Sequence, residues 1–123
     1  MARRGEVYFV DFSPGRGSEQ AGVRPGLIIQ NDAGNFNSPT TIVAAISTQR
    51  RRMYPFHVQI TPVDSGLPQN SVIKCEQIKT VDQVRLTRLA GSLNPAKMRE
   101  VDEALHLSLG LRHQEQPWPR FRR

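Results

Sequence analysis

Short runs of hydrophobic residues alternate with polar segments through the first two thirds of the chain. The polar segments are rich in Gly, Pro, Asn, Asp and Ser, which favour turns and loops. Each run has the length of an ordinary strand. We therefore predict strands at residues 7–10, 27–30, 41–46, 56–60, 71–75 and 88–93. Between them we predict a turn at 31–35 and loops at 16–22, 47–54 and 61–70.

The residues after 94 carry the one clear helical pattern. Asn94 suits the N-cap, and Pro95 suits the first helical position, where its missing N–H needs no partner. Spacings of three and four then place apolar side chains on one face, namely Met98, Val101, Leu105 and Leu109. Gly110 is a good C-terminal stop, and the residues beyond 111 show no periodicity.

The order of these elements predicts a mainly β fold. Several short strands followed by one late helix are typical of a compact antiparallel barrel or sheet with a helix packed on it. No long helical stretch separates the early strands, which argues against a parallel α/β fold. The length of 123 residues suits one domain, which we expect at 1–111, followed by a disordered basic tail at 112–123.

The charge balance indicates a polyanionic partner. Lysine and arginine together number 17 against 11 acidic residues, which gives a net charge of +6 and a pI of about 10.4. Nucleic acid is the usual partner of such a chain. Half of the excess lies in the tail, where four arginines stand against Glu115, so charge alone does not decide the partner.

Other protein classes are excluded by what the sequence lacks. Cys75 is the only cysteine, so an internal disulfide is impossible, and its place within a predicted strand favours a buried, inert thiol. His57, His106 and His113 have no Cys, Asp or Glu at metal-ligand spacing, so we expect no metal, and no motif indicates a cofactor. No signal peptide or membrane span is visible, and we expect a cytoplasmic protein.

Two polar segments could carry chemistry. Residues 17–26 form a predicted polar loop that joins a carboxylate, an amide, a hydroxyl and the Arg24 guanidinium, with Pro25 stiffening the chain beside Arg24. The alternative is a solvated loop in which Arg24 pairs with Glu19. The segment 47–52 places hydroxyls before three arginines, which would bind a phosphate backbone or merely keep the protein in solution.

Five short motifs follow one another in a fixed order along the chain. They are the segments 5–12, 17–25, 47–49, 54–56 and 76–79. Together with the helix around 101–105, they resemble the MazF/PemK family of toxins. The resemblance runs from Arg4 to Leu111 and leaves out only the tail.

The resemblance implies an SH3-like barrel of the MazF/PemK/CcdB toxin type with a C-terminal helix, acting as a homodimer. It implies the toxin of a type II toxin–antitoxin system. Such a toxin is a metal-independent endoribonuclease, or mRNA interferase, that cuts single-stranded RNA in a sequence-selective way. The 2′-OH of the RNA would attack the adjacent phosphorus and leave 2′,3′-cyclic phosphate and 5′-OH ends. An acidic, MazE-like antitoxin is implied as the cognate partner that blocks the RNA groove.

The resemblance also implies roles for residues. Arg24 and Ser47 match the family's catalytic arginine and hydroxyl, and Glu19 matches an acid implicated in some members. The family often has Thr where this chain has Ser47, and the neighbouring Thr48 leaves the choice of hydroxyl open. The side chains that we expect to contact RNA are Ser18, Gln20, Thr48, Gln49, Arg50, Arg51, Arg52, Tyr54 and Gln77.

Two other functions remain open on the sequence. A non-catalytic nucleic-acid-binding barrel would explain the charge and the strands, but it gives the set of Glu19, Arg24 and Ser47 no purpose. A gyrase-poisoning toxin of the CcdB type would require a C-terminal helix that contacts gyrase. The helix here has the apolar stripe of one that packs on a core instead.

Overall fold

The computed structural model describes residues 1–13, 22–48 and 54–112, and the predicted tail therefore lies almost wholly outside it. Its strands are β1 (Glu6–Asp11), β2 (Val23–Ile28), β3 (Thr40–Ser47), β4 (His57–Ile60), β5 (Ser71–Asp82) and β6 (Leu86–Ser92). Its helices are α1 (Asp32–Asn37), α2 (Pro62–Ser65), the short 3₁₀ segment η1 (Gln83–Arg85) and α3 (Pro95–Ser108). Each predicted strand overlaps an observed one, so the mainly β fold is confirmed.

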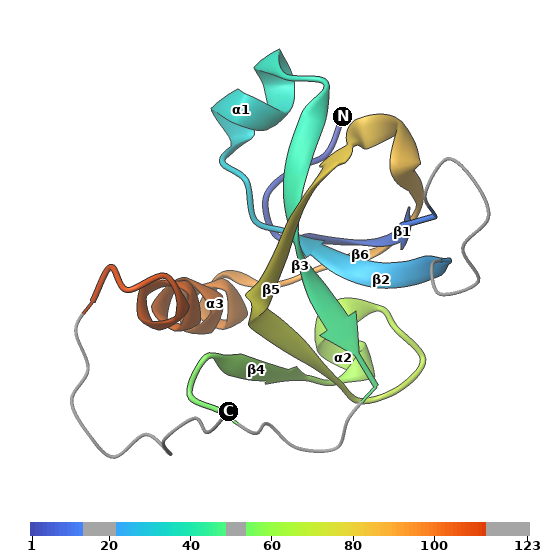
Figure 1. Cartoon of the computed structure of the whole chain (residues 1–123). Coiled ribbons are helices and arrows are strands. Elements are labelled where there is room, and N and C mark those ends of the chain that lie inside the picture. Colours follow the sequence, from blue (N-terminus) through green and yellow to red (C-terminus); the bar gives the residue numbers. More distant parts are fainter. Residues whose placement is uncertain (14–21, 49–53, 113–123) are drawn as a thin grey trace.

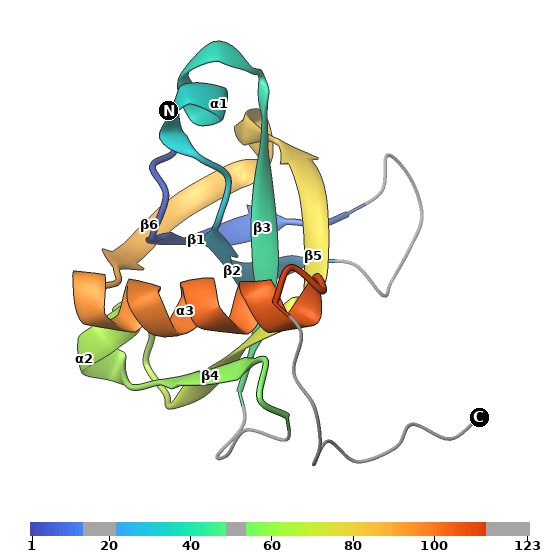
Figure 2. The ribbon, with the colours of Figure 1, turned by 90° about the vertical axis from the view of Figure 1, so that its left-hand side faces the viewer.

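The strands form one antiparallel sheet in the order β4-β5-β3-β2-β1-β6. The sheet curls into a half-barrel (Figure 1), and α3 lies across it (Figure 2). The long strand β5 pairs with β3 over the full length of β3, and the first four residues of β5 also pair with β4. It therefore joins the part of the sheet under α3 to the rest.

Apolar residues are buried on both faces of the curled sheet. Successive side chains on a strand point to opposite faces, so Leu27 and Ala44 join one apolar cluster while Ile28 and Val43 join the other. Val101 of α3 belongs to the first cluster. Burial on both faces explains why the strands appear in the sequence as continuous apolar runs.

Helix α3 begins and packs as predicted. The Asn94 side-chain oxygen accepts the Lys97 N–H at 2.8 Å, and Val101 and Leu105 are buried. Leu109 was expected on the same buried stripe, but it is 56% exposed because the helix ends one residue earlier. None of the helices within 1–13, 22–48 and 54–112 is long and apolar enough to span a membrane.

The predicted turn at 31–35 is part of a helix, α1. The Asn31 side-chain oxygen caps it by accepting the Gly34 N–H at 2.7 Å. The amide oxygen of Asn35, a fully buried residue, accepts the Thr41 hydroxyl at 2.6 Å. Asn and Gly favour turns in general, and only these contacts, which depend on the fold, make a helix the better arrangement here.

The one-turn helix α2 lies within residues 61–70, where the sequence predicted a loop. It packs directly on β6. Thr61 and Asp64 form a capping box at its start, and Gly66 ends it at a φ of 80°. A Cβ on Gly66 would fall onto the carbonyl oxygen of Ala90. Glycine therefore lets the two backbones approach each other, besides allowing the left-handed conformation.

Gly66→Ala should destabilise the fold more than Gly110→Ala does. Both glycines have a positive φ, which costs an alanine about 1–2 kcal/mol. The Cβ would meet open space at Gly110, whereas at Gly66 it adds an overpacking cost of about 1–3 kcal/mol. Urea titrations measure the free energy of unfolding of each variant. Equal losses in the two would contradict the close approach of α2 to β6.

Candidate functional site: a groove beside β3

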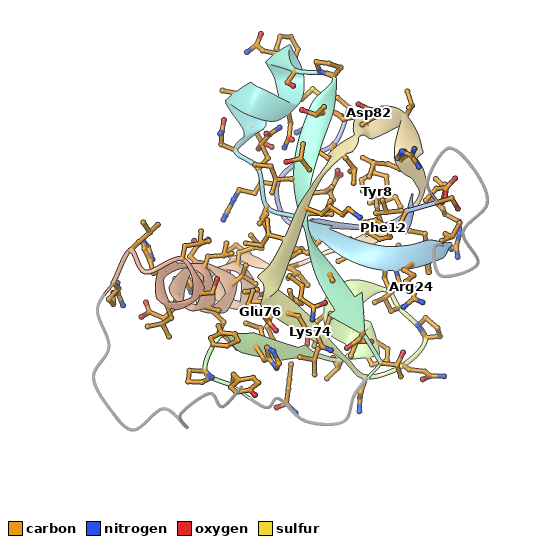
Figure 3. The ribbon with its side chains drawn as sticks, viewed as in Figure 1. Tyr8, Phe12, Arg24, Lys74, Glu76 and Asp82 are labelled. Atoms are coloured by element: carbon orange, nitrogen blue, oxygen red, sulfur yellow. The ribbon has the colours of Figure 1, made fainter. Side chains whose placement is uncertain are left out.

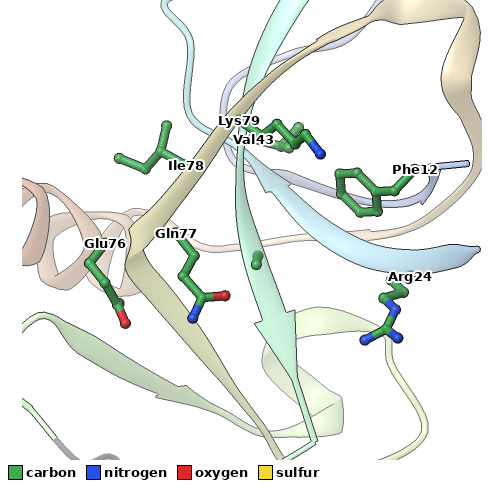
Figure 4. A pocket seen from close by; sticks show the side chains of 8 residues that line it. Phe12, Arg24, Val43, Glu76, Gln77, Ile78 and Lys79 are labelled. Atoms are coloured by element: carbon green, nitrogen blue, oxygen red, sulfur yellow. The ribbon is translucent and has the colours of Figure 1, made fainter. Parts of the chain in front are cut away.

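A groove lies between β2, β3 and β5 on one face of the sheet (Figure 4). Its volume is about 490 Å³, within the usual range of ligand sites. The residues that line it are Phe12, Arg24, Val43, Ala45, Glu76, Gln77, Ile78 and Lys79. Cationic, acidic, amide and aromatic side chains therefore face one space.

The groove opens beside Ala45, where the β2–β3 ladder ends and the β3–β5 ladder is interrupted. On one side, the ladder between β2 and β3 ends at the pair Gly26–Ala45, and the two strands then diverge (Figure 1). On the other side, Ala45 pairs with Lys74 while Ala44 pairs with Ile78. The strand β5 thus carries three additional residues, 75–77, at the level of Ala45.

Arg24 lies on β2, not in the loop that the sequence predicted for 17–26. The β2–β3 ladder ends at the pair Gly26–Ala45, and Arg24 and Ser47 each lie two residues beyond this pair on their own strands. Side chains alternate between the faces of a strand, which puts Arg24 and Ser47 on the face that carries Ala45 and the groove. The exposed Arg24 is accessible to a ligand there.

The two candidate hydroxyls come at the end of β3. Ser47 is the last residue of the strand and is partly buried, whereas Thr48 follows the strand and is exposed. The sequence predicted a loop from residue 47 onward, so the strand is one residue longer than expected. This placement favours Ser47 over Thr48 as the hydroxyl on the face of Arg24.

Glu76 and Gln77 enter the groove from the bulge of β5. They belong to the three residues that the β3 ladder skips, so β3 does not fix their direction. Bulges of this kind commonly turn side chains toward a functional site. Figure 4 shows Gln77 and Arg24 on either side of β3, with Glu76 next to Gln77.

A buried histidine contacts the acid of the groove. His57 on β4 is 2% exposed, and its Nε2 lies 3.2 Å from both carboxylate oxygens of Glu76. Its ring stands edge-on to Tyr54 and Phe56, with centroid distances of 5.3 and 5.4 Å. Figure 3 shows Lys74 and Glu76 on the part of β5 that lies beside β4. Tyr54, expected to contact RNA, thus belongs to an aromatic cluster around His57.

The groove also carries a second cation. The Lys79 Nζ lies 5.7 Å from the centroid of the Phe12 ring, a cation–π distance. Together, Lys79 and Arg24 place two positive charges on the lining. Such charges attract the phosphates of a nucleic acid.

Hydrogen bonds fix the end of β1 at the point where the chain enters the segment 14–21. The Ser13 N–H donates to the Asp11 carboxylate at 2.9 Å, and this bond lowers the pKa of Asp11. The Arg85 guanidinium donates to the backbone carbonyls of Asp11 and Ser13. The approach to the segment that holds Glu19 is therefore anchored to η1.

Cys75 is the buried, inert thiol that the sequence predicted. Burial, together with the smaller effect of the charge of Glu76, raises the pKa of the Cys75 thiol to about 12. A protonated, inaccessible thiol cannot act as a nucleophile. Among the residues that the structure describes, no three His, Cys, Asp or Glu side chains gather as a metal site requires.

The structure therefore brings some of the predicted site residues together. Arg24 and Gln77 line the groove, Ser47 and Thr48 lie at the end of β3, and Tyr54 packs beside His57. The other predicted site residues lie outside the described part of the chain: Ser18, Glu19, Gln20, Gln49, Arg50, Arg51 and Arg52.

Of the lining residues with a charged or aromatic side chain, sequence reasoning missed three, namely Phe12, Glu76 and Lys79. Phe12 ends the motif at 5–12, but no contact with RNA was assigned to that motif. Glu76 and Lys79 lie beyond Cys75, where the predicted strand stopped because the apolar run ends there. For these two residues the motif at 76–79 was the available signal, and from it only Gln77 was taken as a contact.

Comparison with known proteins gives consistent results. A family model described as "PemK-like, MazF-like toxin of type II toxin-antitoxin system" matches residues 3–109. The endoribonuclease EndoA of Bacillus subtilis is 52% identical over 112 residues, which cover 90% of this chain and 97% of EndoA.

Solved structures share the fold. An endoribonuclease in complex with its cognate antitoxin, from a mycobacterial species, has a TM-score of 0.74 at 30% identity, covering 97% of this chain and all of that one. MazF (Form-I) from Deinococcus radiodurans has a TM-score of 0.69 at 24% identity, covering 89% of this chain and 96% of that one. The expected barrel of the toxin type with its C-terminal helix is thereby confirmed.

Proposed function

We propose, from the premise that this chain belongs to the PemK-like, MazF-like toxins of type II toxin–antitoxin systems and is an endoribonuclease, that it cuts single-stranded RNA sequence-selectively and without a metal ion. The observation that carries the proposal is the position of Arg24 in the groove. Arg24 and Ser47 each lie two residues beyond the last β2–β3 pair, Gly26–Ala45, and alternation along the strands favours the same face of the sheet for both. A guanidinium and a hydroxyl on one face of the sheet could both donate hydrogen bonds to one phosphodiester group of the RNA.

A metal-independent cleavage uses the 2′-OH of the RNA itself. Its oxygen attacks the adjacent phosphorus, the P–O5′ bond breaks, and the products are a 2′,3′-cyclic phosphate and a free 5′-OH. The protein then has three tasks: to remove the 2′-OH proton, to neutralise the charge on the phosphorane, and to protonate the leaving oxygen.

Arg24 suits the neutralisation of the phosphorane. A planar guanidinium donates two parallel hydrogen bonds to phosphate oxygens and stays charged at any working pH. Its constant charge makes Arg24 a poor proton donor, so we give it the electrostatic task. Ser47 would donate a further hydrogen bond to a non-bridging oxygen.

Glu19 is our candidate for the general base. The groove holds a second carboxylate, Glu76, among the described residues. Both oxygens of Glu76 lie 3.2 Å from the Nε2 of His57, so this carboxylate already has a partner within the protein. We therefore keep the base at Glu19 and consider Glu76 separately below.

A cognate acidic, MazE-like antitoxin is the proposed protein partner. The mycobacterial endoribonuclease named above was solved with its antitoxin, which supports such a partner here. Arg24 and Lys79 give an acidic segment two cations to pair with in the groove. The homodimer and the cytoplasmic location remain predictions from the sequence.

The two rival functions have less support. A non-catalytic barrel would not explain the 52% identity to an endoribonuclease. A gyrase-poisoning toxin would need the C-terminal helix free to bind another protein, whereas α3 buries Val101, Ala104 and Leu105 in the core.

Arg24→Ala should abolish RNA cleavage while the protein still folds, because Arg24 is exposed and the core does not depend on it. We expect the initial rate on a fluorogenic RNA to fall by at least about 10²–10³-fold. Arg24→Lys should recover only part of the rate, because an ammonium lacks the planar fork. Arg99→Ala, on the surface of α3, is the matched control for loss of one positive charge. Full activity of Arg24→Ala would remove this site assignment.

Ser47→Ala should lose most of the activity, and Thr48→Ala should lose little. The reason is that alternation along β3 puts Ser47 on the groove face, whereas Thr48 lies past the end of the strand. Ser47→Thr should stay active, because it keeps the hydroxyl. Single-turnover rates at saturating RNA measure the effect on the chemical step. Loss of activity in Thr48→Ala alone would show that the neighbouring hydroxyl is the functional one.

A further inference from the structure

The carboxylate of Glu76 has the wrong charge to bind the phosphates of RNA. It lines the same space as Arg24 and Lys79, where it repels the phosphates that those two cations attract. An ionised carboxylate accepts hydrogen bonds and donates none. Its natural partners in RNA are therefore the donors on the bases, not the backbone.

The side chain of Glu76 is held in place from the opposite side. His57 is buried, and its Nε2 lies 3.2 Å from each of the two carboxylate oxygens. Since the carboxylate only accepts, the imidazole is the donor in this contact. The rings of Tyr54 and Phe56, stacked 5.1 Å apart, stand edge-on to His57 and leave it little freedom to turn.

The backbone before Glu76 is fixed as well, although β3 does not pair with it. The Cys75 N–H donates to the Phe56 carbonyl at 3.2 Å, and the Cys75 carbonyl accepts the Ser108 hydroxyl at 2.7 Å. The bulge is thus held by β4 on one side and by α3 on the other. A carboxylate fixed in this way enters the groove already oriented, which a solvated surface acid would not be.

We propose that Glu76 reads one base of the RNA by accepting a hydrogen bond from an exocyclic amino group, and that His57 is its positioning residue. This inference rests on the proposed ribonuclease function and adds a determinant of its sequence selectivity. Unpaired bases present their Watson–Crick edges to a protein. Adenine, cytosine and guanine carry an amino group there. Uracil has none: its one donor, N3–H, lies between two carbonyl oxygens, so a carboxylate that accepts this proton comes close to an oxygen that repels it. Glu76 therefore selects against uracil at one position of the recognition sequence, and the loss of uracil at that position is what we call its exclusion below.

The contact with His57 makes this exclusion effective. Without it, the Glu76 side chain could rotate away from a uracil at little cost, since its residue is exposed. A charge-assisted hydrogen bond from a buried ring opposes that rotation. The neighbouring Gln77, which both donates and accepts, has no such selectivity against uracil.

The first test compares wild type with Glu76→Gln on an RNA pool with randomised positions, by sequencing the ends that cleavage produces. We expect wild type to exclude uracil at one position and Glu76→Gln to accept it there, with a rise in uracil use of about tenfold or more. The amide keeps the shape of the side chain but can donate to a uracil carbonyl. Glu100→Gln on α3 removes an acid outside the groove and should leave every preference unchanged.

The second test concerns His57. His57→Leu fills the same space without a donor and should weaken the exclusion of uracil, whereas His57→Gln keeps a donor and should retain it. On one optimal RNA, His57→Leu should raise KM and leave kcat unchanged, because base recognition acts in the ground state and the transition state alike. A merely structural role would instead lower the melting temperature and kcat together.

A measurement on folded wild-type protein covers the case in which His57→Leu does not fold. The Nε2 proton of His57 should give a downfield NMR signal that moves upfield in Glu76→Gln. An unchanged signal would overturn the positioning role.

The outcomes separate this inference from the proposed function. If wild type cuts no RNA, the proposed function fails and the inference with it. If wild type cuts RNA but tolerates uracil everywhere, or if Glu76→Gln keeps the exclusion, the inference alone is overturned. If Glu76→Gln loses the exclusion of uracil but His57→Leu keeps it, Glu76 still reads the base, and only the positioning role of His57 is overturned.

Discussion

The loss of regular pairing around Ala45 is the constraint on which the site depends. In an unbroken sheet, β2 and β5 would lie directly beside β3 along its whole length and leave no gap next to it. Here the β2–β3 ladder stops at Gly26–Ala45, and the β3–β5 ladder skips three residues at the same level. The small side chain of Ala45 then lines the space. Because the apolar clusters on both faces of the sheet hold the strands in place, the break stays local.

The two sides of this break supply different chemistry. The β2 side carries Arg24, whose charge suits a phosphate, and the end of β3 adds the hydroxyl of Ser47. The β5 side carries the acid and amide of its bulge, which suit the edges of bases. In our account, one side of the groove acts on the backbone of the RNA and the other selects its sequence, which is how contacts divide in nucleic-acid recognition generally.

The sequence predicts those parts of the fold that local patterns determine. The Asn94 cap and the apolar spacing located α3, and the apolar runs located every strand. The second half of β5 escaped because its residues are mostly exposed, so no apolar run marks it. Arg24 was expected in a loop because Pro25 and the nearby glycines indicate turns. Pro25 is tolerated in β2 because it lies beyond the last pair with β3, where that side of β2 needs no N–H donor.

The candidate site likewise has a part that the sequence predicts and a part that depends on the fold. The motifs of the resemblance identified Arg24 and Ser47, but their shared face follows only from the register of β2 and β3. The pairing of Glu76 with His57 joins residues 19 positions apart through the β4–β5 ladder, and no local pattern indicates it. Contacts of this kind depend on which strands become neighbours, and a single sequence does not specify that.

The central claim is that a guanidinium and a hydroxyl on one face of the sheet assist the 2′-OH of the RNA, with no metal ion, in breaking one phosphodiester bond. The most direct test is mass spectrometry of the fragment ends that the purified protein produces from a long RNA in the presence of EDTA. The account predicts discrete fragments with 2′,3′-cyclic phosphate and 5′-OH ends. Fragments with 5′-phosphate and 3′-OH ends, or no cleavage in EDTA where cleavage occurs without it, would contradict it.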